Sequence, residues 1–180
     1  MNTTITIDNP LGVPAHRHTN PDSTEGGWVA NTATVADTAT IADTATVADT
    51  ATITGNARVS GNARVSGNTQ ASDNAWVSGN AWVSGNAWVY GNAQVYGNAQ
   101  VSGNAQVSER QHVLTVGPIG SEDQHATLVL TPVGPWVVVG CWQGHLDQLL
   151  PEAQRRAPGH MDDYTALHAL FASRVSRWNR

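Results

Sequence analysis

Residues 77–100 read VSGNAWVSGNAWVYGNAQVYGNAQ, and this six-residue pattern recurs without insertion from Val29 to Gln106. Each of the thirteen hexads places Val or Ile first, except at Ala71, and Ala fifth, except at Thr69. The third residue is always Gly, Asp or Asn. A fixed short period sustained over this length indicates a repeat architecture.

Each preference has a physical cause. A branched aliphatic residue suits a short strand whose side chain points inward, so positions six and two point outward. The small fifth residue fits a crowded inner corner, and the third residue tolerates the left-handed backbone of a turn. Three hexads complete a triangular coil of 18 residues, and stacked coils pair their strands about 4.8 Å apart. We therefore expect a single-stranded parallel β-helix of about four to five coils over residues 29–108, with Asn56, Asn74 and Asn92 stacked at one corner.

The pattern resembles the hexapeptide-repeat, left-handed parallel β-helix family over residues 29–106. The opening GGWV at 26–29, followed by A-x-V-x-G-N repeats, is similar to a group of bacterial and phage repeat proteins. The tail, with VGPIGS at 116–121 and GCWQG at 140–144, is similar to the ending of some phage-type members. The resemblance implies a left-handed all-β coil, a homotrimer and a phage or prophage origin.

The period stops after Val107, and residues 109–180 predict a small α+β domain that caps the last coil. Candidate strands are 112–116, 126–131 and 136–140. Two C-terminal helices are predicted from helical spacing, which is carried by Leu146, Leu149 and Leu150 and then by Tyr164, Leu167, Phe171, Val175 and Trp178. Residues 1–28 predict an N-terminal cap or a flexible arm.

Composition excludes several classes of protein. The net charge of −5, from fourteen acidic residues and nine arginines, offers no basic stripe for nucleic acid. No apolar run approaches the roughly 20 residues that span a bilayer, and the start lacks the features of a signal peptide. We therefore expect no membrane or nucleic-acid partner, and a location in the cytoplasm or in a virion. Cys141 is the only cysteine, which rules out a disulfide within the chain.

The sixth positions form outward columns in which Trp76, Trp82 and Trp88 occupy one face each. Arg58 is expected beneath Trp76 and Arg64 beneath Trp82, where a guanidinium on an indole could contribute roughly 0.5–1 kcal/mol. Tyr90 and Tyr96 extend this aromatic belt. Three interpretations are open: strand stabilisation, a packing surface for another subunit or for the C-terminal domain, or stacking on planar or sugar-like ligands. A rotational trimer cannot bury three faces equally, so at least one tryptophan should stay partly exposed or be covered by another contact.

The sequence offers few candidate catalytic or metal-binding residues. Many proteins with this repeat are acyltransferases, which typically use a histidine at a subunit groove, but the hexads here contain none, and His112 only follows the last one. Cys141 precedes His145 at what could be a helix start, although a lone cysteine after WVVVG is typical of a buried core. His16 and His18 have a spacing that metal ligands use, yet the remaining ligands are missing. We predict no catalytic residues, no metal and no cofactor.

The sequence therefore favours a non-enzymatic, oligomerising β-helix scaffold, with a trimer preferred, that presents its C-terminal domain to a host or phage protein. One alternative is a phage sponge that binds a small anionic or nucleotide-like ligand at a subunit groove, where GPIGS at 117–121 supplies backbone N–H groups unless it is only a tight turn. A second alternative is an acyltransferase-like enzyme. The candidate binding residues are Trp76, Trp82, Trp88, Tyr90, Tyr96, Arg58, Arg64, Gly117, Ser121 and Trp142.

Overall fold

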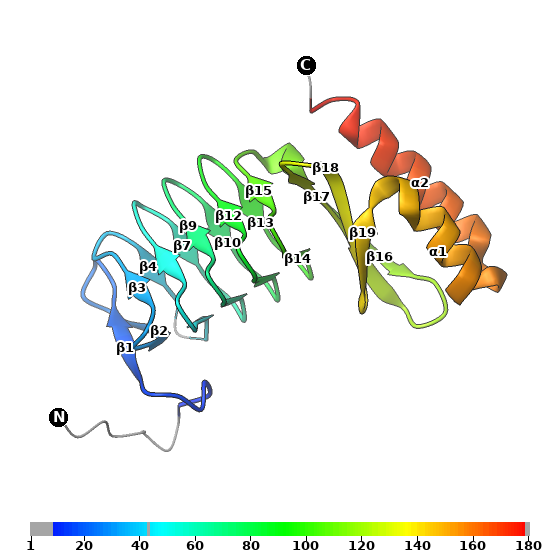
Figure 1. The fold of residues 1–180 in the computed structure, drawn as a ribbon. Coiled ribbons are helices and arrows are strands. Elements are labelled where there is room, and N and C mark those ends of the chain that lie inside the picture. Colours follow the sequence, from blue (N-terminus) through cyan, green and yellow to red (C-terminus); the bar gives the residue numbers. More distant parts are fainter. Residues whose placement is uncertain (1–8, 43, 179–180) are drawn as a thin grey trace.

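The computed structural model describes residues 9–42 and 44–178, which form a β-helical rod followed by a small sheet and two helices (Figure 1). The predicted fold class, a β-helix followed by a small α+β C-terminal domain, is confirmed, and the rod has about four of the four to five coils that were predicted. The strands of the rod are β3 (Thr34–Val35), β4 (Thr40–Ile41), β5 (Thr46–Val47), β6 (Thr52–Ile53), β7 (Arg58–Val59), β8 (Arg64–Val65), β9 (Gln70–Ala71), β10 (Trp76–Val77), β11 (Trp82–Val83), β12 (Trp88–Val89), β13 (Gln94–Val95), β14 (Gln100–Val101) and β15 (Gln106–Val107).

The rod has three faces because every third strand pairs with its counterpart in the next coil. The orders are β13-β10-β7-β4, β15-β12-β9-β6-β3 and β1-β2-β5-β8-β11-β14. All pairs between coils are parallel, and residues 18 apart are in register, as Trp76 is with Arg58 and Gln94. The predicted coil length is therefore correct.

The first and fifth positions fill the core of the rod. From Ile41 to Val107 they are almost completely buried, including Thr69, whose hydroxyl donates to the carbonyl oxygen of Ser66 at 2.6 Å. Burying one Val or Ile side chain contributes roughly 1.5–3 kcal/mol, so a narrow core repeated in each coil is sufficient to hold the rod.

The third position makes the corners. Asp49 and Asp73 have φ of 57° and 59°, and the glycines at this position also have positive φ. A Cβ at Gly61 would lie 2.9 Å from the carbonyl oxygen of Gly79 in the next coil, so the corner needs glycine for space as well as for conformation. Asp49 and Asp73 each accept a hydrogen bond from the backbone N–H one coil above, at 2.8 and 3.0 Å.

Side-chain asparagine ladders form at two corners. They run through Asn62, Asn80 and Asn98 and through Asn68, Asn86 and Asn104, with amide hydrogen bonds of 3.2–3.4 Å. Asn56, Asn74 and Asn92 recur every 18 residues at the third corner, where they were predicted to stack, and the described hydrogen bonds that they make between coils come from backbone groups. Asp73 replaces glycine at that corner, and its carboxylate takes the N–H of Gly91.

An antiparallel hairpin closes the first coil. It consists of β1 (Ala15–Thr19) and β2 (Glu25–Ala30), and β2 joins the rod beside β5. Asn20 Oδ1 accepts a hydrogen bond from the N–H of Ile41 at 2.9 Å, which replaces the coil that would otherwise lie below. The glycine pair of GGWV permits this contact, since a Cβ at Gly27 would lie 2.2 Å from the carbonyl oxygen of Ala45.

The other end of the rod is covered by a four-stranded antiparallel sheet, with the helices on its far side (Figure 1). The elements are η1 (Arg110–His112), β16 (Val113–Ile119), β17 (Gln124–Thr131), β18 (Gly134–Val139), β19 (Trp142–His145), η2 (Leu146–Gln148), α1 (Leu149–Arg156), η3 (Pro158–His160) and α2 (Met161–Val175). No helix in the described part of the chain is long and apolar enough to cross a membrane.

Alternating residues of β17 face opposite ways and join two cores. Val129 packs into the core of the rod, whereas Ala126 and Leu128 pack with the buried Leu167 and Phe171 of α2. Thr127 Oγ1 accepts a hydrogen bond from the N–H of Gln100 at 3.1 Å, which satisfies a backbone group of the last coil. The sheet thus caps the rod on one face and supports the helices on the other.

The sequence missed one strand of this sheet. The helix start expected near Cys141 is wrong, because Gly140 (φ 56°) and Cys141 form the tight turn between β18 and β19. Cys141 is exposed and not buried in a core. The alternative that GPIGS is a tight turn is also wrong in part, because Gly117 to Ile119 continue β16 and the turn occupies residues 120–123.

Candidate functional site

The most distinctive surface feature is the belt formed by Trp76, Trp82 and Trp88. The three side chains lie on β10, β11 and β12, one in each sheet of the rod, and their residues are 45%, 52% and 48% exposed. Three large aromatic rings are thus half open to solvent at one level of the rod. This arrangement agrees with the predicted outward columns.

Hydrogen bonds fix two of the three rings of the belt. The indole N–H of Trp76 donates to Ser60 Oγ at 3.1 Å, and that of Trp82 donates to Ser66 Oγ at 3.4 Å. Arg58 and Arg64 are in register with these tryptophans, as predicted. The expected guanidinium–indole contacts are absent in the described part of the chain, because each indole N–H is turned toward a serine of the coil below.

Two tyrosines extend the aromatic surface unequally. Tyr96 is 65% exposed, whereas Tyr90 is half-buried. A cation–π contact does occur at the opposite end of the rod, where the guanidinium carbon of Arg17 lies 5.4 Å from the centre of the Trp28 ring. That pair belongs to the hairpin that closes the first coil, so it is separate from the belt.

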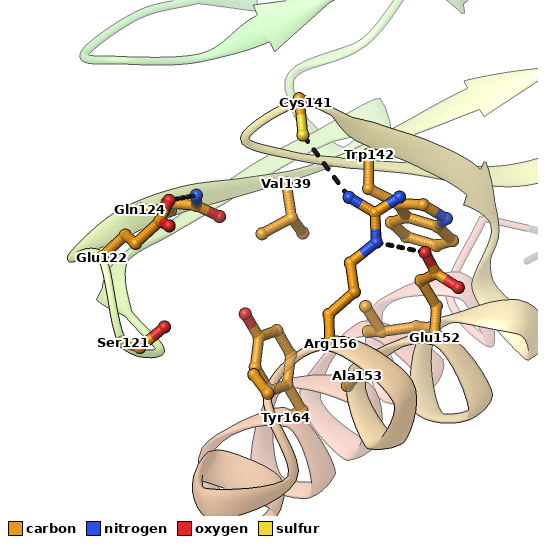
Figure 2. Close-up of a pocket in the computed structure, with 12 residues that line it drawn as sticks. Ser121, Glu122, Gln124, Val139, Cys141, Trp142, Glu152, Ala153, Arg156 and Tyr164 are labelled. Atoms are coloured by element: carbon orange, nitrogen blue, oxygen red, sulfur yellow. Dashed lines mark hydrogen bonds and ion pairs between the residues drawn. The ribbon is translucent and has the colours of Figure 1, made fainter.

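A pocket of about 140 Å³ lies between the sheet and the two helices (Figure 2). Figure 2 shows side chains from the 120–123 turn, β18, the Cys141 turn, α1 and α2 around one space. The structure brings Ser121 and Trp142 to this pocket, while Gly117 does not line it and lies exposed in β16. The lining residues are Ser121, Glu122, Gln124, Val139, Cys141, Trp142, Leu149, Glu152, Ala153, Arg156, Ala157 and Tyr164.

An ion-pair cluster forms one wall of this pocket. Glu152 accepts hydrogen bonds from Arg155 and Arg156, which lowers the pKa of its carboxyl group to about 2. Arg156 Nη1 also lies 3.5 Å from Cys141 Sγ, so its side chain bridges α1 and the β18–β19 turn. Tyr164 adds a hydroxyl group from α2, and burial raises the pKa of that hydroxyl.

The acidic side chains that line this pocket outnumber its basic ones. Glu122 and Glu152 both line it, against the single cation Arg156, whose guanidinium already binds Glu152. A formally negative wall repels a small anion and favours a polar molecule that carries an amine or several hydrogen-bond donors.

The histidines singled out in the sequence have structural partners. His112 is half-buried, its Nδ1 lies 3.2 Å from Ser108 Oγ, and its ring packs edge-on against Trp178 with centroids 6.0 Å apart. Burial lowers the pKa of His112, although the charge of Glu109 opposes this. His145 packs against Trp136 at 4.9 Å, and no hydrogen bond joins it to Cys141 among the described residues.

The first two histidines belong to the hairpin that closes the rod. His16 Nδ1 lies 3.0 Å from Asn31 Oδ1, and His18 Nε2 lies 3.1 Å from the carbonyl oxygen of Ala39. Over residues 9–42 and 44–178, no three His, Cys, Asp or Glu side chains are grouped so that they could hold a metal ion.

One interpretation of the belt is that it packs against the C-terminal domain, and β19 of that domain does overhang Trp82. A groove is lined by Trp82 and Gln100 of the rod and by Trp142 and Gln143 of β19, and Ser102 Oγ donates to Gln143 Oε1 at 3.3 Å. Trp142 therefore has one side toward the pocket and another toward the belt. No local signal in the sequence could have placed these residues together, because the overhang depends on how β19 docks.

Comparison with known families supports the repeat. The family model described as YdcK beta solenoid repeat matches residues 57–73, 75–91, 81–97 and 93–109. These matches include the belt and the last coils of the rod. Comparisons with curated proteins and with solved structures found no match. The matched segments and the stacked coils together identify a β-helix repeat protein.

Proposed function

We propose that this protein is a non-enzymatic scaffold whose rod associates with further copies of itself through the belt and presents the C-terminal domain to a partner. The observation that carries the proposal is the half exposure of Trp76, Trp82 and Trp88 at one level of the rod. Large apolar surface left open on a soluble fold commonly marks a contact with another molecule. The likeness of the tail to phage-type repeat proteins supports an origin in a phage or prophage.

Burial of the tryptophan rings of the belt can supply a substantial part of the free energy of association. Covering about 100 Å² of one tryptophan contributes ~2.5 kcal/mol at about 25 cal/mol per Å². Two such rings buried in each contact, together with the surrounding Ser and Gln side chains, give a driving force that offsets part of the entropy lost on association. The indole N–H groups of Trp76 and Trp82 already have partners within the rod, so covering their rings leaves no polar atom unpaired.

The symmetry of a rod with three faces limits how the belt is used. In a closed ring of parallel rods, each rod contacts its neighbours with two faces at most, while the third face points to solvent. The Trp82 face is also overhung by β19. We therefore infer that, in the trimer that the family resemblance implies, the three tryptophans are buried unequally.

Single substitutions test this proposal. Glutamine occupies the same hexad position at Gln70, Gln94, Gln100 and Gln106, so Trp→Gln at residues 76, 82 and 88 keeps the rod intact. Sedimentation velocity over a dilution series should show that at least one substitution weakens association tenfold or more and at least one has no effect. If all three substitutions weakened association equally, the closed ring of parallel rods would be contradicted. Gln70→Ala, on the same sheet as Trp88 and below it, is the matched control.

A second candidate function is the capture of a small polar molecule in the pocket of Figure 2, because Ser121, Trp142 and Tyr164 converge there beside Arg156. The negative wall favours an amine-bearing ligand over the anion that a sponge-type protein would need. Thermal shift measurements with small amines and with nucleotides should show stabilisation by the amines only, and Glu122→Gln should remove it. Stabilisation by nucleotides that survives Glu122→Gln would favour the sponge alternative instead.

An acyltransferase-like activity receives less support. His112 is held by Ser108 and Trp178, and the thiol of Cys141 faces Arg156. We therefore propose that neither residue has a catalytic role. Turnover of an acyl donor that is lost in His112→Gln or Cys141→Ser would contradict this part of the proposal.

A further inference from the structure

A second groove, of about 290 Å³, lies where the rod meets the C-terminal domain, at the β16 edge of the sheet. The rod supplies Gln94 and Tyr96, the segment after the last coil supplies Arg110, Gln111 and Thr115, and α2 supplies Arg174. We call it the arginine groove. None of these residues was singled out in the sequence except Tyr96, because the groove exists only when α2 and the rod are brought together.

The charge of the arginine groove is opposite to that of the pocket in Figure 2. Arg110 and Arg174 both line it, and no Asp or Glu does. Some other arginines of the described chain form ion pairs with acidic side chains. Arg17 pairs with Glu25, and Arg155 pairs with Glu152. In a chain of net charge −5, two arginines that line one groove with no carboxylate among the lining residues form a distinct positive site.

The two arginines come from separate elements that are tied together. Trp178 Nε1 donates to the carbonyl oxygen of Gln111 at 2.6 Å, and the Trp178 ring packs against His112. These contacts hold η1 against the end of α2, so Arg110 and Arg174 have a fixed relationship through the backbone. The remaining polar groups are two neutral amides and two hydroxyls, which can donate to an anion without competing for it.

We propose that the arginine groove binds a small molecule in which a phosphate group is attached to a planar ring. A guanidinium offers a planar fork of N–H donors that matches phosphate oxygens, and two of them can clamp one dianion. Tyr96, which is 65% exposed at the rim, offers a ring face for stacking. This proposal does not rest on self-association through the belt.

Isothermal titration calorimetry of the full chain with phenyl phosphate, inorganic phosphate and phenol tests the site at constant ionic strength. We expect one phenyl phosphate per chain, bound at least fivefold more tightly than inorganic phosphate, with no binding of phenol. Arg110→Gln and Arg174→Gln should each weaken phenyl phosphate binding tenfold or more. Tyr96→Ser, which installs the residue found at the same hexad position at Ser78 and Ser84, should leave the affinities for the two phosphates equal.

Two control variants distinguish specific binding of phosphate in the arginine groove from nonspecific attraction of phosphate to surface arginines. Arg58→Gln removes an exposed arginine on the same face of the rod and should leave both affinities unchanged. Arg174→Lys keeps the charge but removes the planar fork, and it should weaken binding several-fold. Equal losses in Arg58→Gln and Arg110→Gln, or no binding of either phosphate by the wild-type chain, would overturn the proposal. The midpoint of thermal unfolding, measured without ligand, verifies that each variant is folded.

Discussion

The indole N–H of Trp76 donates a hydrogen bond to Ser60 Oγ, 3.1 Å away in the coil below. Trp82 and Ser66 repeat this relationship at 3.4 Å. The polar end of each ring is therefore satisfied within the rod, and the surface that remains open is carbon. Such a ring can be covered by another chain without the cost of an unpaired donor, which is about 1–3 kcal/mol.

Gly27 lies in the N-terminal hairpin, where close packing against the rod leaves no space for a side chain. A Cβ at this position would lie 2.2 Å from the carbonyl oxygen of Ala45, a backbone atom that cannot swing away. Gly27→Ala should therefore lower the free energy of unfolding by about 1–3 kcal/mol, measured by urea denaturation. Gly159→Ala is the control, because a Cβ there meets no atom within 4 Å. A Gly27→Ala protein as stable as Gly159→Ala would show that the hairpin does not dock on the first coil.

Thr127 connects the sheet to the last coil. Its Oγ1 accepts the N–H of Gln100 at 3.1 Å, and its side chain is fully buried. Thr127→Val keeps the shape but removes the acceptor, so it should lower the free energy of unfolding by about 1–3 kcal/mol. Thr165→Val, on the exposed side of α2, should change the same quantity by less than about 0.5 kcal/mol. Equal effects of the two substitutions would mean that the sheet does not cap the rod.

His112 should make stability depend on pH. Its pKa is lowered, chiefly by burial, so the folded protein disfavours the charged ring, whereas the unfolded chain takes up the proton near 6.5. The contribution of His112 is therefore complete above pH 6.5 and declines as the pH falls below that value. Urea denaturation at pH 7.5 and 5.5 should show a larger loss of stability for the wild type than for His112→Gln. A matching loss in His112→Gln would refute the prediction.

The rod could be predicted from the sequence because each hexad encodes its own geometry. Val77 and Ala81 are buried and Trp82 is outward for reasons local to six residues, and Gly79 turns the corner as expected. The pairing of Trp76 with Arg58 follows from coil length alone. The orientation of the Trp76 side chain could not be predicted in the same way. The six-residue period does not specify side-chain geometry, and that geometry decides whether the indole contacts Arg58 or Ser60.

The C-terminal domain was predictable in its helices and less so in its sheet. Tyr164, Leu167 and Phe171 recur at helical spacing and are buried together in α2, as expected. The strand β19 was missed because WQGH is short and polar, and it pairs only through the hairpin turn at Gly140. The pocket beside Trp142 and the arginine groove were beyond prediction, since each assembles residues from elements that meet only after the sheet docks on the rod.

The most direct test of self-association through the belt is native mass spectrometry of the wild-type protein beside the variant in which Trp76, Trp82 and Trp88 are all replaced by Gln. The wild type should give an assembly of three chains of 19.0 kDa, and the triple variant should give a single chain with an unchanged far-ultraviolet circular dichroism spectrum. A wild-type monomer at micromolar concentration, or a triple variant that remains assembled, would contradict the proposal.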